Sequence, residues 1–234
     1  MASRFVFYYW PLPFRGNFVR NIFAYTGTAY EEAPTEKMLE MKNSRVADQP
    51  GPFMAPPMLH DTQDDVFISQ MPAICFYLSH QMGLMPSGLA EQAMAMKVIG
   101  DCTDVIEEIT RSTGAQMWDK EAWGEFSTVR FVRWLSIFEE LGTKNKLSDK
   151  DGFILGTEEA TVADLAVHAL FATMERCLPQ LSPILRKNAP NVMALVDRLS
   201  ANDGLKALVD KQKEALGNTY CGGMIEKSIR SMVE

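Results

Sequence analysis

The sequence has no long apolar run and no cluster of basic residues. A membrane-spanning helix needs about 20 consecutive apolar residues, and no run approaches that length. With 23 Lys and Arg against 30 Asp and Glu, the net charge is −7. Nucleic acids and anionic membranes bind concentrated positive charge, so we expect neither as a partner. The first residues also lack the charged start and cleavage site of a signal peptide, and we therefore expect a cytoplasmic protein.

Cysteine and histidine are also scarce. The cysteines show neither C-x-x-C nor zinc-finger spacing, and we predict free thiols at Cys75, Cys102, Cys177 and Cys221. Three should be buried as small apolar residues, whereas Cys221 lies beside Gly222 in a segment expected to be exposed and reactive. The histidines lie far apart without an i, i+4 pair, so no metal site is predicted.

The first 27 residues carry the strongest pattern. Residues 5–10 are β-favouring and apolar, which predicts a buried strand. Pro11 and Pro13 end it, and apolar residues at four-residue steps then predict a helix that stops at Gly27. A tyrosine therefore stands at the carboxyl end of a strand, facing the first turn of a helix. Sheets with helical connections bind ligands at this place, and a helix N-terminus favours an anion there.

The remaining pattern divides the chain in two. Residues 28–33, 57–61 and 66–69 are predicted strands, and 34–45 and 70–82 are predicted helices. After a linker at 85–88, only helices are predicted, over 89–113, 120–141, 161–177, 183–187, 190–200 and 204–216. Residues 218–234 either form a last helix or fray. The fold class is therefore α+β, with a βαβαββα domain over 1–85 and an all-helical domain over 89–234.

Four short motifs, in order, resemble those of the cytosolic glutathione transferases, nearest to the tyrosine-type mu and sigma classes. They are Tyr9-Trp10 with Arg20, the cis-proline strand at Pro57, the run from Gln70 to Ile74, and the capping box of Thr161 and Asp164. The resemblance covers roughly residues 5–211. It implies a thioredoxin-like first domain, glutathione as co-substrate, no metal, and a homodimer. The implied activity, typical of detoxification, is conjugation of glutathione to a small hydrophobic electrophile.

In this interpretation Tyr9 stabilises the glutathione thiolate, which is the attacking nucleophile. Lowering a thiol pKa from about 8.5 by roughly 2 units requires about 3 kcal/mol. One hydroxyl hydrogen bond to a charged acceptor supplies roughly 1.5–3 kcal/mol, and a helix N-terminus adds about 0.3–1 kcal/mol. A single tyrosine is therefore enough. Tyr8 is the alternative hydrogen-bond donor. Alternatively, Tyr9 is a packed aromatic residue of the core with no role in catalysis.

The resemblance also implies the residues that bind glutathione. They are Trp10, Lys42, Arg45, Pro56, Pro57, Gln70, Met71 and Asp101 of the partner subunit. Pro56 has a carbonyl but no N–H, Met71 replaces the family's usual serine, and Pro72 lacks another donor. Solvated roles are equally compatible with Lys42, Arg45 and Asp101.

The electrophile site should lie between the turn after the first strand and the end of the 89–113 helix. Its expected residues are Leu12, Phe14, Ile109, Thr110 and Thr113. Phe53 is expected to insert into the partner subunit, with local packing as the alternative. Thr161 and Asp164 are expected to be structural.

Two other functions remain open at this stage. The same thiolate could serve isomerisation or peroxide reduction. Alternatively, the fold could be a non-catalytic binding or structural module, which the departures at Pro56, Met71 and Pro72 favour.

Overall fold

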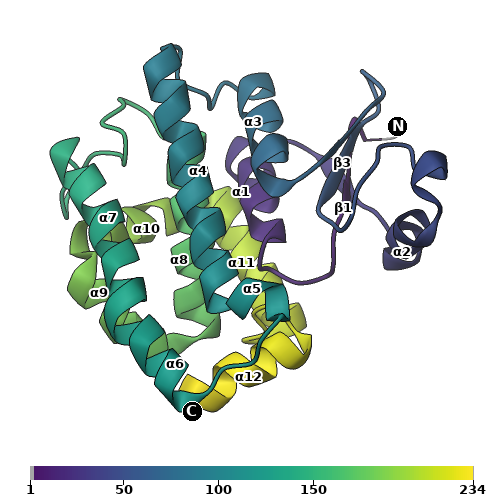
Figure 1. The fold of residues 1–234 in the computed structure, drawn as a ribbon. Helices are drawn as coiled ribbons and strands as arrows, with labels where there is room; N and C mark the ends of the chain where they lie inside the picture. Colours follow the sequence, from purple (N-terminus) through teal and green to yellow (C-terminus); the bar gives the residue numbers. More distant parts are fainter. Residues whose placement is uncertain (1–2, 234) are drawn as a thin grey trace.

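A computed structural model describes residues 3–233 and shows a small sheet beside a larger helical part (Figure 1). The strands β1 (Phe5–Tyr8), β2 (Tyr30–Glu32), β3 (Met58–Asp61) and β4 (Val66–Ser69) form one sheet in the order β2-β1-β3-β4. β1 is parallel to β2 and antiparallel to β3, which is antiparallel to β4. The helices α1 (Gly16–Thr26), α2 (Thr35–Asn43) and α3 (Met71–Gln81) complete the predicted βαβαββα order.

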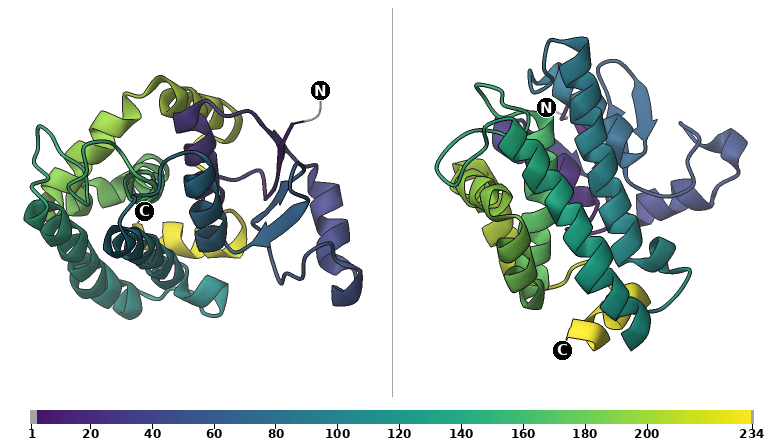
Figure 2. Two further views of the ribbon diagram at one scale, coloured as in Figure 1. Left: turned by 90° about the horizontal axis from the view of Figure 1, so that it is seen from above. Right: turned by 60° about the vertical axis from the view of Figure 1, so that its left-hand side comes forward.

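The two faces of the sheet pack against different helices. α1 and α3 lie on the side of the helical part, whereas α2 covers the outer face (Figure 2). Because side chains alternate along a strand, Phe7 and Tyr9 join the large core with α1, and Tyr8 joins a small core with Met38 under α2. Neighbouring tyrosines therefore lie on opposite faces of the sheet.

The helical part is built around α8 (Val162–Cys177), which is almost entirely buried. α8 packs against α1, against α4 (Leu89–Ile109) and against α10 (Pro190–Ser200). The other elements are α5 (Arg111–Gly114), α6 (Lys120–Glu125), the π-helical turn η2 (Phe126–Arg130), α7 (Phe131–Lys144), α9 (Ser182–Asn188), α11 (Asp203–Leu216) and α12 (Gly223–Val233), with short 3-10 turns at η1 (Val46–Asp48) and η3 (Pro179–Leu181). An all-helical second part is therefore confirmed.

Some predicted element ends were wrong. The predicted 120–141 helix is interrupted by η2, and the 89–113 helix ends at Ile109. Residues Arg111, Ser112 and Thr113 then have φ of 48°, 58° and 54°, in the left-handed region that few non-glycine residues adopt. Beyond 218 the chain forms α12 instead of fraying; Glu234 lies outside the described residues.

A capping box begins α8. The Asp164 carboxylate accepts hydrogen bonds from the N–H of Thr161 (2.8 Å), its hydroxyl (2.8 Å) and the N–H of Ile154 (2.7 Å). Burial raises the pKa of Asp164, and these hydrogen bonds oppose the rise. The carboxylate thus ties the 145–160 loop to the central helix.

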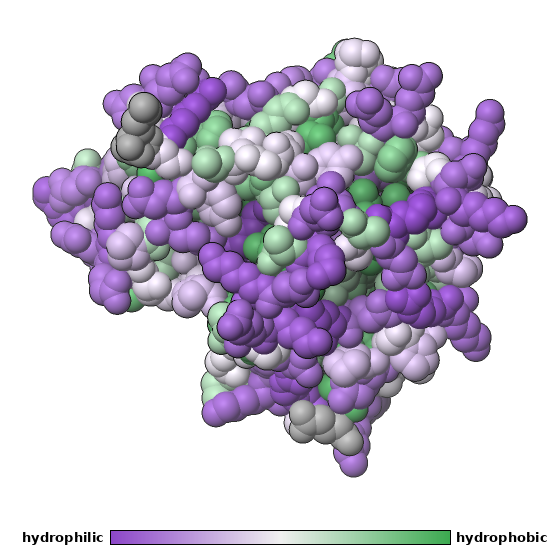
Figure 3. Space-filling view, turned by 180° about the vertical axis from the view of Figure 1, so that it is seen from behind, coloured by the Kyte–Doolittle hydropathy of each residue, from purple (hydrophilic) through white to green (hydrophobic). Residues whose placement is uncertain are grey.

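Within residues 3–233, no helix is long and apolar enough to cross a membrane. Seen from behind, the surface is mostly hydrophilic, and hydrophobic residues show as small separate areas (Figure 3).

An ion pair between the buried Asp61 and the partly exposed Arg4 lies at the opposite edge of the sheet and predicts a pH dependence of stability. The Asp61 carboxylate accepts hydrogen bonds from Arg4 (2.7 Å) and from the Tyr77 hydroxyl (2.8 Å). Although burial favours the neutral acid, these hydrogen bonds lower its pKa to about 2. A lowered pKa stabilises the folded state above the unfolded pKa of about 3.9, and this contribution disappears as the pH falls through about 2.

We therefore expect Asp61→Asn to lower the free energy of unfolding by roughly 2 kcal/mol at pH 7. The difference from wild type should shrink between pH 4 and pH 2, measured by urea unfolding. Asp65→Asn is the control, because the Asp65 side chain is 87% exposed. A pH-independent difference would contradict the role of the Asp61 charge.

Candidate active site

Three predicted site residues stand side by side at one edge of the sheet. The register pairs Tyr8 with Met58 and Met58 with Ser69. One step further along these strands are Tyr9, Pro57 and Gln70. α1 begins shortly after Tyr9, and α3 begins directly after Gln70. The edge therefore faces two helix N-termini, whose N–H groups favour an anion.

The backbone of this edge has two unusual features. The Pro56–Pro57 peptide is cis, immediately before β3. Gln70 is exposed and has φ of 74°, a left-handed conformation that is uncommon for a residue other than glycine. Such outliers concentrate at binding and catalytic sites, which makes the exposed Gln70 a candidate ligand-binding residue. The neighbouring Met71 side chain is buried, leaving only its backbone toward this edge.

Tyr9 lies under the turn that joins β1 to α1. Its ring stacks on Phe7 with 6.0 Å between ring centroids, and the residue is only 5% exposed. Gly16 is needed for this packing, because a Cβ there would lie 2.5 Å from the tyrosine ring. Burial raises the pKa of Tyr9 above its ordinary value, while the charges of Arg15 and Arg20 act to lower it. At neutral pH Tyr9 is therefore a protonated hydrogen-bond donor.

Tyr8 faces the opposite side of the sheet from Tyr9. It is 3% exposed and packs with Met38, Phe53 and Met58 on the outer face of the sheet. The alternative donor is thus on the wrong side of the strand for the start of α1.

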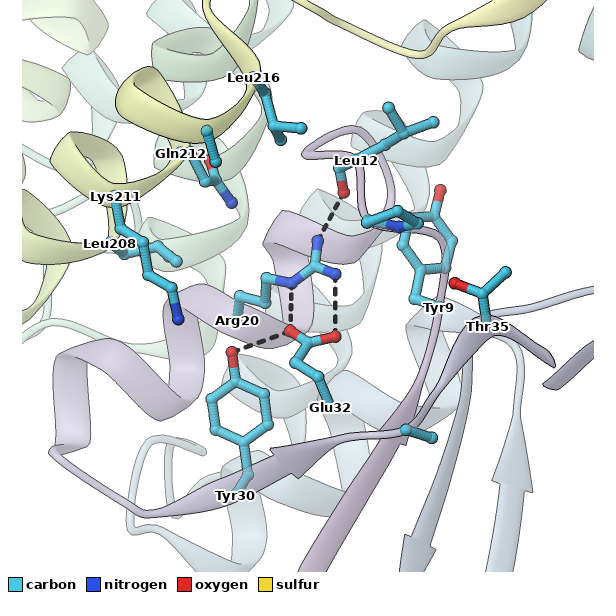
Figure 4. A pocket seen from close by; sticks show the side chains of 13 residues that line it. Tyr9, Leu12, Arg20, Tyr30, Glu32, Thr35, Leu208, Lys211, Gln212 and Leu216 are labelled. Carbon is cyan, nitrogen blue, oxygen red and sulfur yellow. Dashed lines mark hydrogen bonds and ion pairs between the residues drawn. The ribbon is translucent and has the colours of Figure 1, made fainter. Parts of the chain in front are cut away.

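Arg20 holds the turn after β1. It is 5% exposed and forms hydrogen bonds with Glu32 at 2.6 and 3.1 Å. It also donates to the carbonyl oxygens of Trp10 (3.1 Å) and Leu12 (2.5 Å). Figure 4 shows the contacts with Glu32 and with the Leu12 carbonyl oxygen meeting at its guanidinium group. Arg20, which lies 11 residues after Tyr9, therefore fixes the conformation of the turn that follows β1. The sequence pattern alone did not reveal this role.

Arg15 was not predicted as a site residue. Its guanidinium forms an ion pair with Glu107 of α4 at 3.0 Å and is 18% exposed. The same Glu107 accepts a hydrogen bond from the Thr113 hydroxyl at 2.8 Å. Arg15 thus links the start of α1 to α4 and brings a positive charge near Tyr9. The only feature of the sequence that could have pointed to Arg15 is its position shortly after Tyr9.

Comparison with known families decides the relationship. The family model described as "Glutathione S-transferase, C-terminal domain" matches residues 94–232. The chain belongs to the glutathione S-transferase family. No curated protein matches the sequence at a significant level.

Solved structures of glutathione transferases have the same fold. A Pi-class glutathione S-transferase of Onchocerca volvulus has a TM-score of 0.72 at 17% identity, with 91% of this chain and 95% of that chain covered. The protein NaGST-2 has a TM-score of 0.72 at 20% identity, covering 90% and 98% of the chains. Prostaglandin synthase D of Nilaparvata lugens has a TM-score of 0.69 at 18% identity, covering 89% and 98%.

The predicted electrophile pocket is closed in this glutathione transferase family member. Ile109 and Thr110 are 0% and 1% exposed. The Thr110 hydroxyl donates to the Ile106 carbonyl at 2.8 Å. Phe14 packs edge-on against Tyr220 with 5.3 Å between ring centroids. The C-terminal segment therefore fills the space between Phe14 and the end of α4. Of the other two residues predicted for the electrophile site, Leu12 is half-buried and Thr113 is exposed.

That C-terminal segment is fixed by a carboxylate. The backbone N–H groups of Tyr220, Cys221 and Gly222 donate to Glu226 at 3.0, 3.0 and 2.6 Å. Arg230 donates to the same side chain at 2.8 Å. Cys221 is consequently half-buried, and burial raises its pKa to about 12. The segment around Cys221 is therefore packed and not the exposed tail that the sequence predicted, whereas the predicted burial of Cys75, Cys102 and Cys177 is confirmed.

The other predicted residues are less closely grouped. Arg45 is 82% exposed in its side chain and pairs with Asp48 at 2.6 Å, and Lys42 lies in the last turn of α2. Trp10 is half-buried. Asp101 pairs with Lys97 one turn away on α4. Phe53 is buried in the small core of its own subunit, the position that the local-packing alternative expects.

In the part of the chain that the structure describes, no group of three or more His, Cys, Asp or Glu side chains could hold a metal ion.

Proposed function

We propose that this protein is a tyrosine-type glutathione transferase that joins the glutathione thiolate to a small hydrophobic electrophile. The observation that carries the proposal is the shared edge of Tyr9, Pro57 and Gln70, at the starts of α1 and α3. Glutathione would lie along this edge, with its sulfur at the Tyr9 hydroxyl and its γ-glutamyl group at Gln70.

Tyr9 acts as a donor and not as a base. Because burial raises its pKa, the phenol keeps its proton near neutral pH, and its O–H can donate a hydrogen bond to a sulfur anion. A hydrogen bond to a charged acceptor supplies roughly 1.5–3 kcal/mol. The Arg15 charge and the N-terminus of α1 act in the same direction, and the latter contributes about 0.3–1 kcal/mol. These contributions cover the roughly 3 kcal/mol needed to ionise the thiol near pH 7.

The peptide part of glutathione would be held by fewer bonds than an extended strand normally offers. Pro56 supplies a carbonyl acceptor without an N–H, and Pro72 supplies no donor at the start of α3. The exposed Gln70 and the Met71 N–H supply polar groups at this edge, and we propose that Lys42 of α2 and Arg45 reach the glycyl carboxylate. We place Asp101 of the partner subunit near the amino group, where its negative charge would pair with it.

A non-catalytic binding module is the second candidate. The Phe14–Tyr220 contact favours it, because the expected electrophile space is filled. Isomerisation with the same thiolate is a variant of the enzymatic proposal, and one of the similar structures carries the name prostaglandin synthase D.

Two measurements separate these candidates. The enzyme should be retained on immobilised glutathione and should turn over a chromogenic aryl halide with glutathione. Retention without turnover would support the binding module. Absence of retention would contradict a glutathione site at the edge of Tyr9, Pro57 and Gln70.

We further propose a cytoplasmic homodimer in which Met54 takes the role first assigned to Phe53. Phe53 is 9% exposed, whereas Met54 is 88% exposed, although an apolar side chain is usually covered. Further exposed apolar side chains, Phe76 and Leu89, lie in α3 and at the start of α4.

We expect Met54→Asp to shift the dimer toward the monomer, because a carboxylate would have to be desolvated in an apolar contact. Sedimentation equilibrium measures the change as an increase in the dimer dissociation constant of at least about tenfold. Met224→Asp on α12 is the matched control, since Met224 is 65% exposed and outside this surface. Equal dissociation constants for both variants would exclude Met54 from the interface.

A further inference from the structure

A cavity of about 410 Å³ lies in the helical part, where α10 packs against α8 and α11 (Figure 1). Its lining comes entirely from these helices and from Asn218, which follows α11. It therefore shares no described residue with the edge of Tyr9, Pro57 and Gln70. Its volume is within the range of roughly 300–1,000 Å³ that is typical of small-molecule sites.

The wall of this cavity is mainly polar. Eight of its eleven lining residues carry a charged or polar side chain, and the other three are Ala172, Val196 and Val209. A hydrophobic ligand would cover these polar groups without giving them hydrogen-bond partners, which is unfavourable. A ligand with hydroxyl groups would give them such partners. The cavity therefore favours a hydrophilic molecule.

The three acidic side chains that line the cavity are each paired with a basic side chain. Arg186 contacts Glu175 at 2.7 Å and Asp197 at 2.9 Å. Lys206 contacts Asp210 at 2.6 Å. A cationic ligand would have to displace Arg186 or Lys206 from these carboxylates. The cavity therefore disfavours a cation.

Two basic side chains of the wall, Arg176 of α8 and Lys213 of α11, form no ion pair within residues 3–233. Nη1 of Arg176 donates to the Gly217 carbonyl oxygen at 2.8 Å. Its Nη2 is shielded from water and has no hydrogen-bond acceptor among the described residues. A buried donor without an acceptor is unfavourable, so an anionic oxygen brought by a ligand would be bound with a gain in free energy.

A phosphate group matches these two cations better than a carboxylate does. The planar guanidinium group of Arg176 can donate two parallel hydrogen bonds to phosphate oxygens. A phosphate monoester carries about 1.5 to 2 negative charges at pH 7, so it can pair with Arg176 and Lys213 together. The Ser200 hydroxyl and the Asn218 amide of the same wall are available for hydroxyl groups of the ligand.

We propose that this cavity binds a small hydroxylated molecule that carries one phosphate monoester. The phosphate pairs with Arg176 and Lys213, and the rest of the molecule lies over Ala172 and Val209 in the interior of the cavity. This site does not depend on glutathione transfer, and its occupancy can be measured without glutathione.

The test is calorimetric titration of the full chain with glucose 6-phosphate at fixed ionic strength, with glucose and inorganic phosphate for comparison. Arg176→Met should weaken glucose 6-phosphate binding about tenfold, because it removes a charge-assisted hydrogen bond. Lys213→Met changes an exposed side chain and should weaken binding about threefold. Lys211→Met is the matched control, because Lys211 lies on the same helix but does not line this cavity. Glucose should bind more weakly than glucose 6-phosphate, and equally to wild type and all three variants.

Four results would overturn the site. The first is no binding of glucose 6-phosphate by the wild type, and the second is equal affinity in Lys213→Met and Lys211→Met. The third is undiminished binding in Ala172→Trp, whose indole should fill the cavity, with an unchanged thermal unfolding curve. The fourth is equal affinity of the wild type for inorganic phosphate and glucose 6-phosphate, which would exclude the hydroxylated body from the contact. Failure of the protein to conjugate glutathione would leave all of these measurements intact.

Discussion

Replacing Tyr9 by phenylalanine is expected to lower kcat/KM for glutathione conjugation about 10- to 100-fold. The change removes one hydroxyl from a residue that is 5% exposed and leaves its stacking on Phe7 in place. The lost hydrogen bond to the sulfur anion is worth roughly 1.5–3 kcal/mol, and each 1.4 kcal/mol is about a factor of ten. The thiolate absorbance of bound glutathione, followed against pH, should show the thiol pKa rising by about 1–2 units.

Tyr8→Phe is the matched control for this experiment. It makes the same chemical change one residue earlier, on the opposite face of the sheet among Met38, Phe53 and Met58. We expect wild-type kinetics and an unchanged thiol pKa. If Tyr9→Phe kept the wild-type pH profile while Tyr8→Phe lost it, the donor would have to reach glutathione from the α2 side. That outcome would contradict the proposed geometry.

The sheet, and the proximity of Tyr9, Pro57 and Gln70 at one of its edges, could be predicted because they depend on local patterns. The β-favouring run before Pro11 and the helical spacing up to Gly27 set β1 and α1. The short strands at β3 and β4 then place Pro57 and Gln70 beside Tyr9 through ordinary antiparallel pairing. Alternation along β1 also separates Tyr8 from Tyr9, a consequence that follows from the period of two.

The electrophile side could not be predicted, because it depends on contacts between distant parts of the chain. Phe14 meets Tyr220 only because α11 and α12 return to the turn after β1. No local pattern encodes that return. Similarly, the left-handed residues from Arg111 to Thr113 end α4 where helical spacing alone would extend it.

The Phe53 prediction shows the limit of a resemblance in an irregular loop. Of the adjacent apolar residues Phe53 and Met54, only Phe53 enters the small core. The segment from 44 to 57 has no repeating pattern from which that choice could be predicted. Arg20 is a different case. Its spacing was visible, yet its role required knowledge of where the carbonyl oxygens of Trp10 and Leu12 point.

Replacing Asp164 by alanine is expected to be the most destabilising change in the helical part. Asp164 is 0% exposed and accepts hydrogen bonds from the N–H groups of Ile154 and Thr161. Without the carboxylate, both buried donors lose their partners, and each costs roughly 1–3 kcal/mol. We expect the free energy of unfolding to fall by about 4 kcal/mol, a large share of the 5–15 kcal/mol typical of a domain. For a chain of this size the midpoint of thermal unfolding should fall by roughly 8–16 °C.

Asp203→Ala provides the matched control, because Asp203 is an exposed acid in the first turn of α11. Asn202 already caps that helix through bonds to the N–H groups of Gly204 (3.0 Å) and Leu205 (3.1 Å). The control should therefore change the midpoint by less than about 2 °C. Equal shifts for the two variants would mean that water replaces the Asp164 carboxylate at Ile154 and Thr161. A large fall of the unfolding midpoint for Asp164→Ala with a small one for Asp203→Ala would mean that the destabilisation comes from the buried N–H groups that lose their acceptor. Loss of a favourable interaction with the helix dipole would affect both variants alike.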